Sequence, residues 1–96
     1  NENGEEVIPL FVSELLTPNQ PGVESKWRIV NIEKYPTANV KVYSVDWIIV
    51  FESWSYKNDW DGKGKEGNSL PSGPYYYIID RGDETTVVEG WLYIFK

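Results

Sequence analysis

The stretch LPSGPYYYIIDRGD, residues 70–83, contains a clear β-strand pattern between turn-forming residues. Its centre, residues 75–80, consists of aromatic and β-branched residues, which are typical of a β-strand. Turn-forming proline and glycine precede this run, and Gly82 follows it, where it can take the positive φ that a hairpin turn requires. Side chains alternate along a strand, so Tyr76 lies on the opposite face from its two tyrosine neighbours. We expect one of these faces in the core and the other on the surface.

On either side of this stretch, the chain consists of short apolar runs separated by turn-forming residues. The candidate strands are Val7–Val12, Ser13–Leu16, Lys26–Ile32, Val40–Phe51 and Thr85–Phe95. The run from Val40 is long for one strand, so a turn is expected near Ser44–Trp47. No stretch repeats apolar residues with helical spacing over three turns. The pattern predicts an all-β chain, folded as an immunoglobulin-like antiparallel β-sandwich of about seven short strands.

The length and charge of the chain limit its organisation and its partners. Ninety-six residues are enough for one domain, which we place at residues 7–96, with residues 1–6 as an acidic leader or linker remnant. The net charge of −6 is the wrong sign for binding phosphates, so nucleic acid is not an expected partner. No apolar run is long enough to cross a bilayer, so we expect no membrane insertion. We also expect a monomer.

The absence of cysteine and histidine narrows the chemistry. The chain has neither residue, so it lacks a disulfide, a thiolate for zinc and the usual general base near neutral pH. Asp59 and Asp61 lie two residues apart, but nothing near them supplies a nucleophile. We therefore predict a protein that is not an enzyme and holds no cofactor and no metal, with its stability resting on 5 Trp, 7 Tyr and 3 Phe.

A series of short motifs resembles one known family. From about residue 8 to the end, the chain is similar to the gliding-motility-associated C-terminal domains, the type B sorting domains of type IX secretion in Bacteroidetes-like bacteria. The motifs that carry the resemblance, in family order, include FVSELLTPN (11–19), NIEKYP (31–36), VKVY (40–43), VFES (50–53), WDG (60–62), YYY (75–77) and GW (90–91). Such domains are small β-sandwiches.

The resemblance implies a function in protein transport. The domain would be a non-catalytic C-terminal sorting or anchoring signal, carrying an N-terminal cargo domain through the periplasm and outer membrane to the cell surface. Its partners would be the cargo and the outer-membrane components of type IX secretion. The retained family motifs supply the residues for recognition by the translocon, namely Pro18, Asn19, Gly22, Trp60, Asp61, Gly62, Leu70, Pro71 and Gly73.

Three loops depart from the family pattern. Where the family continues Gly-Asp-Gly after the Thr-Pro-Asn motif, residues 20–22 are Gln-Pro-Gly, which removes acidic oxygens suited to calcium. Residues 43–47 are Tyr-Ser-Val-Asp-Trp in place of Tyr-Asn-Arg-Trp-Gly, and residues 73–75 are Gly-Pro-Tyr in place of Gly-Thr-Tyr. Because the strands are kept while loops change, a redesigned scaffold that has lost its native partner is an alternative.

Two further alternatives concern binding. Trp54, Tyr56 and Trp60 could stack on sugar rings, as in carbohydrate-binding β-sandwich modules, but burial is the favoured interpretation, because a small sandwich without disulfides needs large aromatics. The runs 7–12 and 85–95 could accept a strand from another chain at an unpaired edge, or could be paired internally. The Arg-Gly-Asp triplet beginning at Arg81 is interpreted as turn chemistry rather than as a ligand for integrins.

Overall fold

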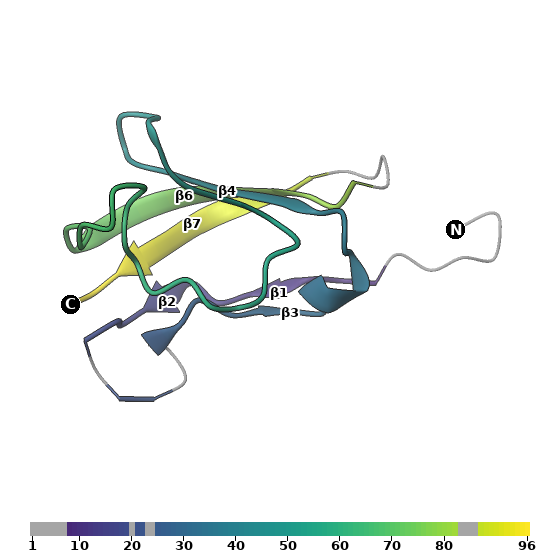
Figure 1. Ribbon diagram of the computed structural model, residues 1–96, viewed down its shortest axis with the longest axis horizontal. Helices are drawn as coiled ribbons and strands as arrows, with labels where there is room; N and C mark the ends of the chain where they lie inside the picture. Colours follow the sequence, from purple (N-terminus) through teal and green to yellow (C-terminus); the bar gives the residue numbers. More distant parts are fainter. Residues whose placement is uncertain (1–7, 20, 23–24, 83–86) are drawn as a thin grey trace, which may run out of the picture.

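The computed structural model describes residues 8–19, 21–22, 25–82 and 87–96. Apart from a short 3₁₀ helix, η2, the regular secondary-structure elements of this part of the chain are β-strands (Figure 1). The elements are β1 (Phe11–Val12), β2 (Leu15–Leu16), β3 (Ile29–Val30), η2 (Ile32–Lys34), β4 (Asn39–Tyr43), β5 (Ile49–Trp54), β6 (Gly73–Asp80) and β7 (Val88–Ile94). The predicted all-β class is confirmed, whereas the leader proposed at residues 1–6 lies outside the described residues.

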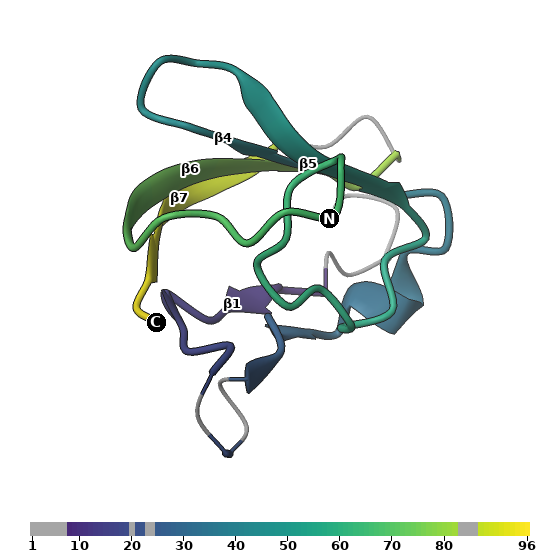
Figure 2. The same ribbon diagram turned by 60° about the vertical axis from the view of Figure 1, so that its left-hand side comes forward.

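The strands form two layers. A five-stranded sheet has the order β2-β7-β6-β4-β5, and β1 pairs with β3 in a two-stranded sheet. Figure 2 shows the two-stranded layer facing the larger sheet, as expected for a sandwich. The turn expected near Ser44–Trp47 is confirmed, because β4 ends at Tyr43 and β5 begins at Ile49.

One strand pair differs from the antiparallel expectation. β2 pairs with β7 in parallel, whereas the other pairs are antiparallel. The reason is that the chain changes sheets between β1 and β2. The Ser13 N–H donates to the Arg28 carbonyl (3.0 Å), and the Glu14 carbonyl then accepts from the Tyr93 N–H (2.9 Å). β7 is thus paired with β6 along Val88–Ile94 and with β2 at Tyr93 and Ile94, which favours the interpretation of internal pairing over an unpaired edge at those two residues.

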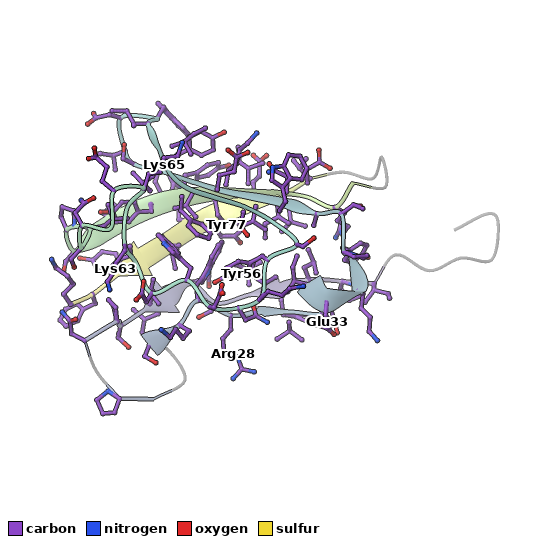
Figure 3. The ribbon with its side chains drawn as sticks, in the orientation of Figure 1. Arg28, Glu33, Tyr56, Lys63, Lys65 and Tyr77 are labelled. Carbon is purple, nitrogen blue, oxygen red and sulfur yellow. The ribbon has the colours of Figure 1, made fainter. Side chains whose placement is uncertain are left out.

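The core lies between the layers and is centred on Trp27, whose side chain is fully buried. Its ring centroid lies 5.7 Å from Tyr56, 5.8 Å from Trp60 and 5.7 Å from Tyr77. Figure 3 shows Tyr56 and Tyr77 between the layers, and Arg28 pointing away from them. The predicted alternation is confirmed, since Tyr77, like Tyr75, is buried and Tyr76 faces outward.

Hydrogen bonds tie this aromatic core to the long connection between β5 and β6. The Tyr56 hydroxyl donates to the Trp27 carbonyl (2.7 Å) and accepts from the Trp60 N–H (2.9 Å). The Trp27 N–H donates to the Trp60 carbonyl (2.8 Å), and the Trp60 indole N–H donates to the Lys63 carbonyl (2.8 Å). The connection is therefore held in place by buried aromatic residues although it contains little regular structure.

Removing the Tyr56 hydroxyl is expected to destabilise the domain. Tyr56→Phe leaves a buried carbonyl and a buried N–H without their partner, so the free energy of unfolding should fall by about 1–3 kcal/mol. Tyr93→Phe is the matched control, because Tyr93 is exposed, and it should change stability by less than about 0.5 kcal/mol. Urea unfolding followed by circular dichroism measures both. Equal stability of the two variants would contradict this role for Tyr56.

The buried hydroxyl of Tyr56 should also make the domain less stable at alkaline pH. Burial raises the pKa of Tyr56 above its usual value, whereas the unfolded side chain titrates near pH 10. Between pH 10 and the higher folded pKa the unfolded state releases its proton first, so the stabilisation is complete below about pH 10 and decreases above it. Unfolding measured from pH 8 to 12 should therefore show a shallower decrease for Tyr56→Phe than for the wild type. An identical slope would contradict the prediction.

Candidate functional site

Four of the candidate recognition residues lie together in one cluster, namely Pro18, Trp60, Asp61 and Gly62. This glycine has a φ of +84°, and a Cβ built on it would lie 3.3 Å from Leu16 Cδ2 and 3.6 Å from Pro18 Cγ. Its carbonyl accepts from the Leu70 N–H (3.1 Å). Trp60 is 4% exposed, so only the edge of this cluster faces solvent. Pro18, Trp60 and Gly62 therefore hold the loop against the sandwich.

Asp61 is the charged member of the same cluster. One carboxylate oxygen lies 3.6 Å from Lys63 Nζ and 4.0 Å from Lys26 Nζ. All three side chains are partly exposed, so these ion pairs contribute little to stability. Asp61 is thus accessible to a partner.

Asn19 and Gly22 lie outside this cluster, in the loop that follows β2. Both are exposed. Gly22 has a φ of +128°, and its carbonyl accepts from the Ser25 N–H (3.2 Å) and from the Ser25 hydroxyl (2.8 Å). The structure therefore does not bring the nine candidates into one continuous site.

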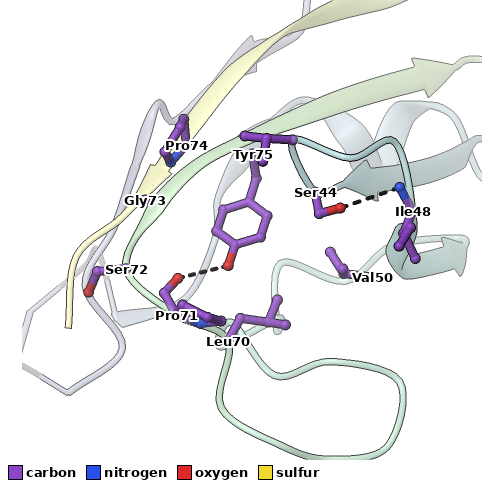
Figure 4. Close-up of a pocket in the computed structure, with 10 residues that line it drawn as sticks. Ser44, Ile48, Val50, Leu70, Pro71, Ser72, Gly73, Pro74 and Tyr75 are labelled. Atoms are coloured by element: carbon purple, nitrogen blue, oxygen red, sulfur yellow. Dashed lines mark hydrogen bonds between the residues drawn. The ribbon is translucent and has the colours of Figure 1, made fainter.

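Leu70, Pro71 and Gly73 form a second group, which lines a pocket of about 410 Å³. The pocket lies between the segment before β6 and the β4–β5 turn, and Figure 4 shows Leu70 and Tyr75 facing Ile48 and Val50. Its full lining is Ser44, Val45, Ile48, Val50, Leu70, Pro71, Ser72, Gly73, Pro74 and Tyr75. None of these residues is charged, so the pocket is suited to an apolar side chain.

Two hydrogen bonds fix the walls of the pocket (Figure 4). The Tyr75 hydroxyl donates to the Pro71 carbonyl (2.7 Å), which holds the segment before β6 across the ring. Burial raises the pKa of Tyr75, so the hydroxyl keeps its proton at neutral pH. On the other wall, the Ser44 hydroxyl accepts from the Ile48 N–H (3.3 Å). Val45 and Ile48 stay exposed at the rim, at 58% and 63%.

Sequence reasoning missed the rim residues of the pocket. Val45 was assigned only to the turn at Ser44–Trp47 and Ile48 only to the strand run Val40–Phe51, although apolar side chains in and beside a turn could have marked a contact surface. The Arg81 and Gly82 of the Arg-Gly-Asp triplet lie after β6, whereas Asp83 is outside the described residues.

The three rings considered for sugar stacking do not share a surface. Trp54 is 69% exposed at the end of β5, whereas Tyr56 and Trp60 are buried next to Trp27. Within the described ranges, no group of three or more acidic residues could hold a metal ion. No helix in the same residues is long and apolar enough to cross a membrane.

The Gly62 cluster yields a prediction with an internal control. Gly62 and Gly67 have nearly the same positive φ, +84° and +83°, but nothing lies within 4 Å of a Cβ at Gly67. Gly67→Ala should cost about 1–2 kcal/mol from backbone strain alone. Gly62→Ala should cost about 1 kcal/mol more, because its methyl group crowds Leu16. Thermal and urea unfolding of both variants measure the difference, and a smaller loss for Gly62→Ala would contradict it.

Comparisons with known proteins agree with this architecture. The family model described as CHU_C type IX secretion signal domain matches residues 10–94. A similar solved structure is that of PorZ, an essential bacterial surface component of the type-IX secretion system of Porphyromonas gingivalis, with a TM-score of 0.66 and 17% sequence identity. The match covers 91% of this chain but only 11% of PorZ, so it establishes the fold alone. No curated protein matches the chain.

Proposed function

The chain belongs to the family of CHU_C type IX secretion signal domains, and from this premise we propose that it directs an attached cargo protein through the type IX system to the cell surface. The cargo is a domain N-terminal to this chain, and the receptor is an outer-membrane component of the system. The family is defined as a secretion signal rather than by a catalytic activity. The proposed role is accordingly one of binding, without catalysis or a cofactor.

The apolar pocket is the observation that carries the proposed mode of recognition. It combines the candidate residues Leu70, Pro71 and Gly73 with two exposed apolar residues, Val45 and Ile48. Residues at protein interfaces contribute most to the binding free energy where an apolar side chain fills a pocket that excludes water. We propose that the receptor inserts an apolar side chain between Leu70 and the β4–β5 turn.

The remaining candidates have two different roles in this proposal. Pro18, Trp60 and Gly62 act indirectly, because they fix the loop whose far end supplies Leu70 to the pocket. Asn19, Gly22 and Asp61 are accessible to solvent and are available for polar contacts at the rim of the interface. Replacing Trp60 or Gly62 would therefore test folding rather than recognition.

Export of a reporter separates recognition from folding. In a gliding bacterium, a fluorescent reporter fused before residue 1 should be displayed on intact cells. Ile48→Glu places a charge on the pocket rim at an exposed position, and should reduce display by roughly a factor of ten, as expected for loss of about 1.4 kcal/mol from a central contact. Val30→Glu adds the same charge at an exposed position on β3 and should keep display within about twofold.

Unfolding of the purified domains shows whether each variant is folded. Display of the Ile48→Glu fusion at the wild-type level would exclude the pocket as the recognition site. A wild-type fusion that is folded but stays inside the cell would contradict the sorting function itself, and would favour a scaffold whose altered loops no longer bind the native receptor.

A further inference from the structure

Four aromatic side chains form a continuous row on the outer face of the five-stranded sheet, which we call the aromatic ridge. It consists of Tyr43 on β4, Trp47 in the β4–β5 turn, Tyr76 on β6 and Trp91 on β7. Successive ring centroids lie 6.1 Å, 5.3 Å and 5.0 Å apart, each pair in an edge-to-face arrangement. Tyr76 and Trp91 are direct cross-strand partners, so the centre of the ridge is held by the sheet itself.

The ridge is distinct from the pocket. Tyr76 points away from the core, whereas its neighbour Tyr75 points inward and lines the pocket. The two tryptophans of the ridge are the most exposed of its members, with Trp47 at 61% and Trp91 at 51%. Rings that leave half their surface in water contribute little to the core, so folding alone does not explain them.

The backbone conformation of Trp47 also indicates that this residue serves binding rather than folding. Its φ is +63°, in the left-handed region that costs a bulky residue about 1–2 kcal/mol and that glycine takes freely. The turn is closed without help from the indole, since the Ser44 N–H donates to the Ile48 carbonyl (2.9 Å) and the Trp47 N–H donates to the Ser44 carbonyl (3.0 Å). Glycine would therefore suit this position better for folding, and the strained, exposed tryptophan indicates binding.

Polar groups lie beside the rings. The Tyr76 hydroxyl donates to Glu89 Oε1 (2.7 Å), and this bond raises the pKa of Tyr76. The second carboxylate oxygen of Glu89 can accept from a ligand hydroxyl. Glu52 shares this outer face and accepts from the Asn39 amide (3.0 Å). Ring faces flanked by hydrogen-bond acceptors suit a sugar, which has C–H groups on its faces and hydroxyls around its edge.

The negative charge of the chain and of this face limits which ligands could stack on the rings. The chain carries a net charge of −6, and Glu52 and Glu89 lie on the face of the ridge, so nucleic acids and acidic polysaccharides are repelled. A dry protein interface would have to desolvate both carboxylates together with Lys41, which also lies on this outer face of β4. We propose that the aromatic ridge binds an uncharged polysaccharide, whose hydroxyls satisfy these groups without desolvating a charge of their own.

Pull-down and affinity electrophoresis with microcrystalline cellulose, xylan, mannan and dextran test the proposal, with alginate as the acidic comparison. The wild-type chain should bind at least one uncharged polymer and bind it better than alginate. Trp47→Gly and Trp91→Ala should each weaken that binding by roughly tenfold, which corresponds to about 1.4 kcal/mol per ring. Phe11→Ala removes a ring that is 60% exposed on β1, in the other sheet, and should leave binding within about twofold.

Trp47→Gly also separates binding from folding. Because relief of the positive φ offsets the loss of the ring contacts, this variant should unfold close to the wild-type temperature while losing binding. The proposal is overturned if no uncharged polymer in the panel binds, if alginate binds better, or if Phe11→Ala weakens binding as much as Trp91→Ala. Concentration-dependent dimers that dissociate in Trp91→Ala would also overturn it, because the ridge would then be covered by a second copy of the chain.

Discussion

The structure depends on the burial of Trp27 between the two sheets. Its ring contacts aromatic side chains from β6 and from the connection after β5, and its two backbone groups are both satisfied by that connection. In a chain of 96 residues without cysteine, this cluster performs the role that disulfides have in many small exported domains. Because the long connection is fixed by Trp60 and Tyr56, its far end can supply one wall of the pocket at Leu70.

Alternation along β6 then separates the two surfaces of functional interest. Tyr75 and Tyr77 point inward, where one lines the pocket and the other contacts Trp27, while Tyr76 points outward into the aromatic ridge. Gly90 is the partner of Tyr77 across the ladder, and a Cβ there would lie 2.8 Å from the Tyr77 hydroxyl. Its neighbour Trp91 faces the other way. The motif Gly-Trp thus makes room on the inner face and supplies a ring on the outer face.

The fold class was predictable because the information for it is local. Strand residues and turn formers alternate along the chain, and the tyrosine run places Tyr76 on the opposite face from Tyr75 and Tyr77, as observed, without indicating which face is buried. The parallel pairing of β2 with β7 was not predictable, because it depends on a change of sheet at Ser13 and Glu14 that no local pattern marks. The pocket was missed for a similar reason, since its two walls, within residues 44–50 and 70–75, are distant in sequence and meet only in the folded chain. Among the candidate residues, the motifs did not distinguish buried from exposed positions, since Trp60 is 4% exposed whereas Asn19 and Gly22 are exposed.

If the receptor binds at the apolar pocket, residues on the pocket rim must lie next to it during export. A photo-crosslinking amino acid in place of Ile48, in a reporter fusion that is still exported, measures this proximity, with the same group in place of Val30 as the comparison. We expect a covalent adduct with an outer-membrane component of type IX secretion from position 48 and none from position 30. Export without an adduct at position 48, or equal adducts from both positions, would contradict it.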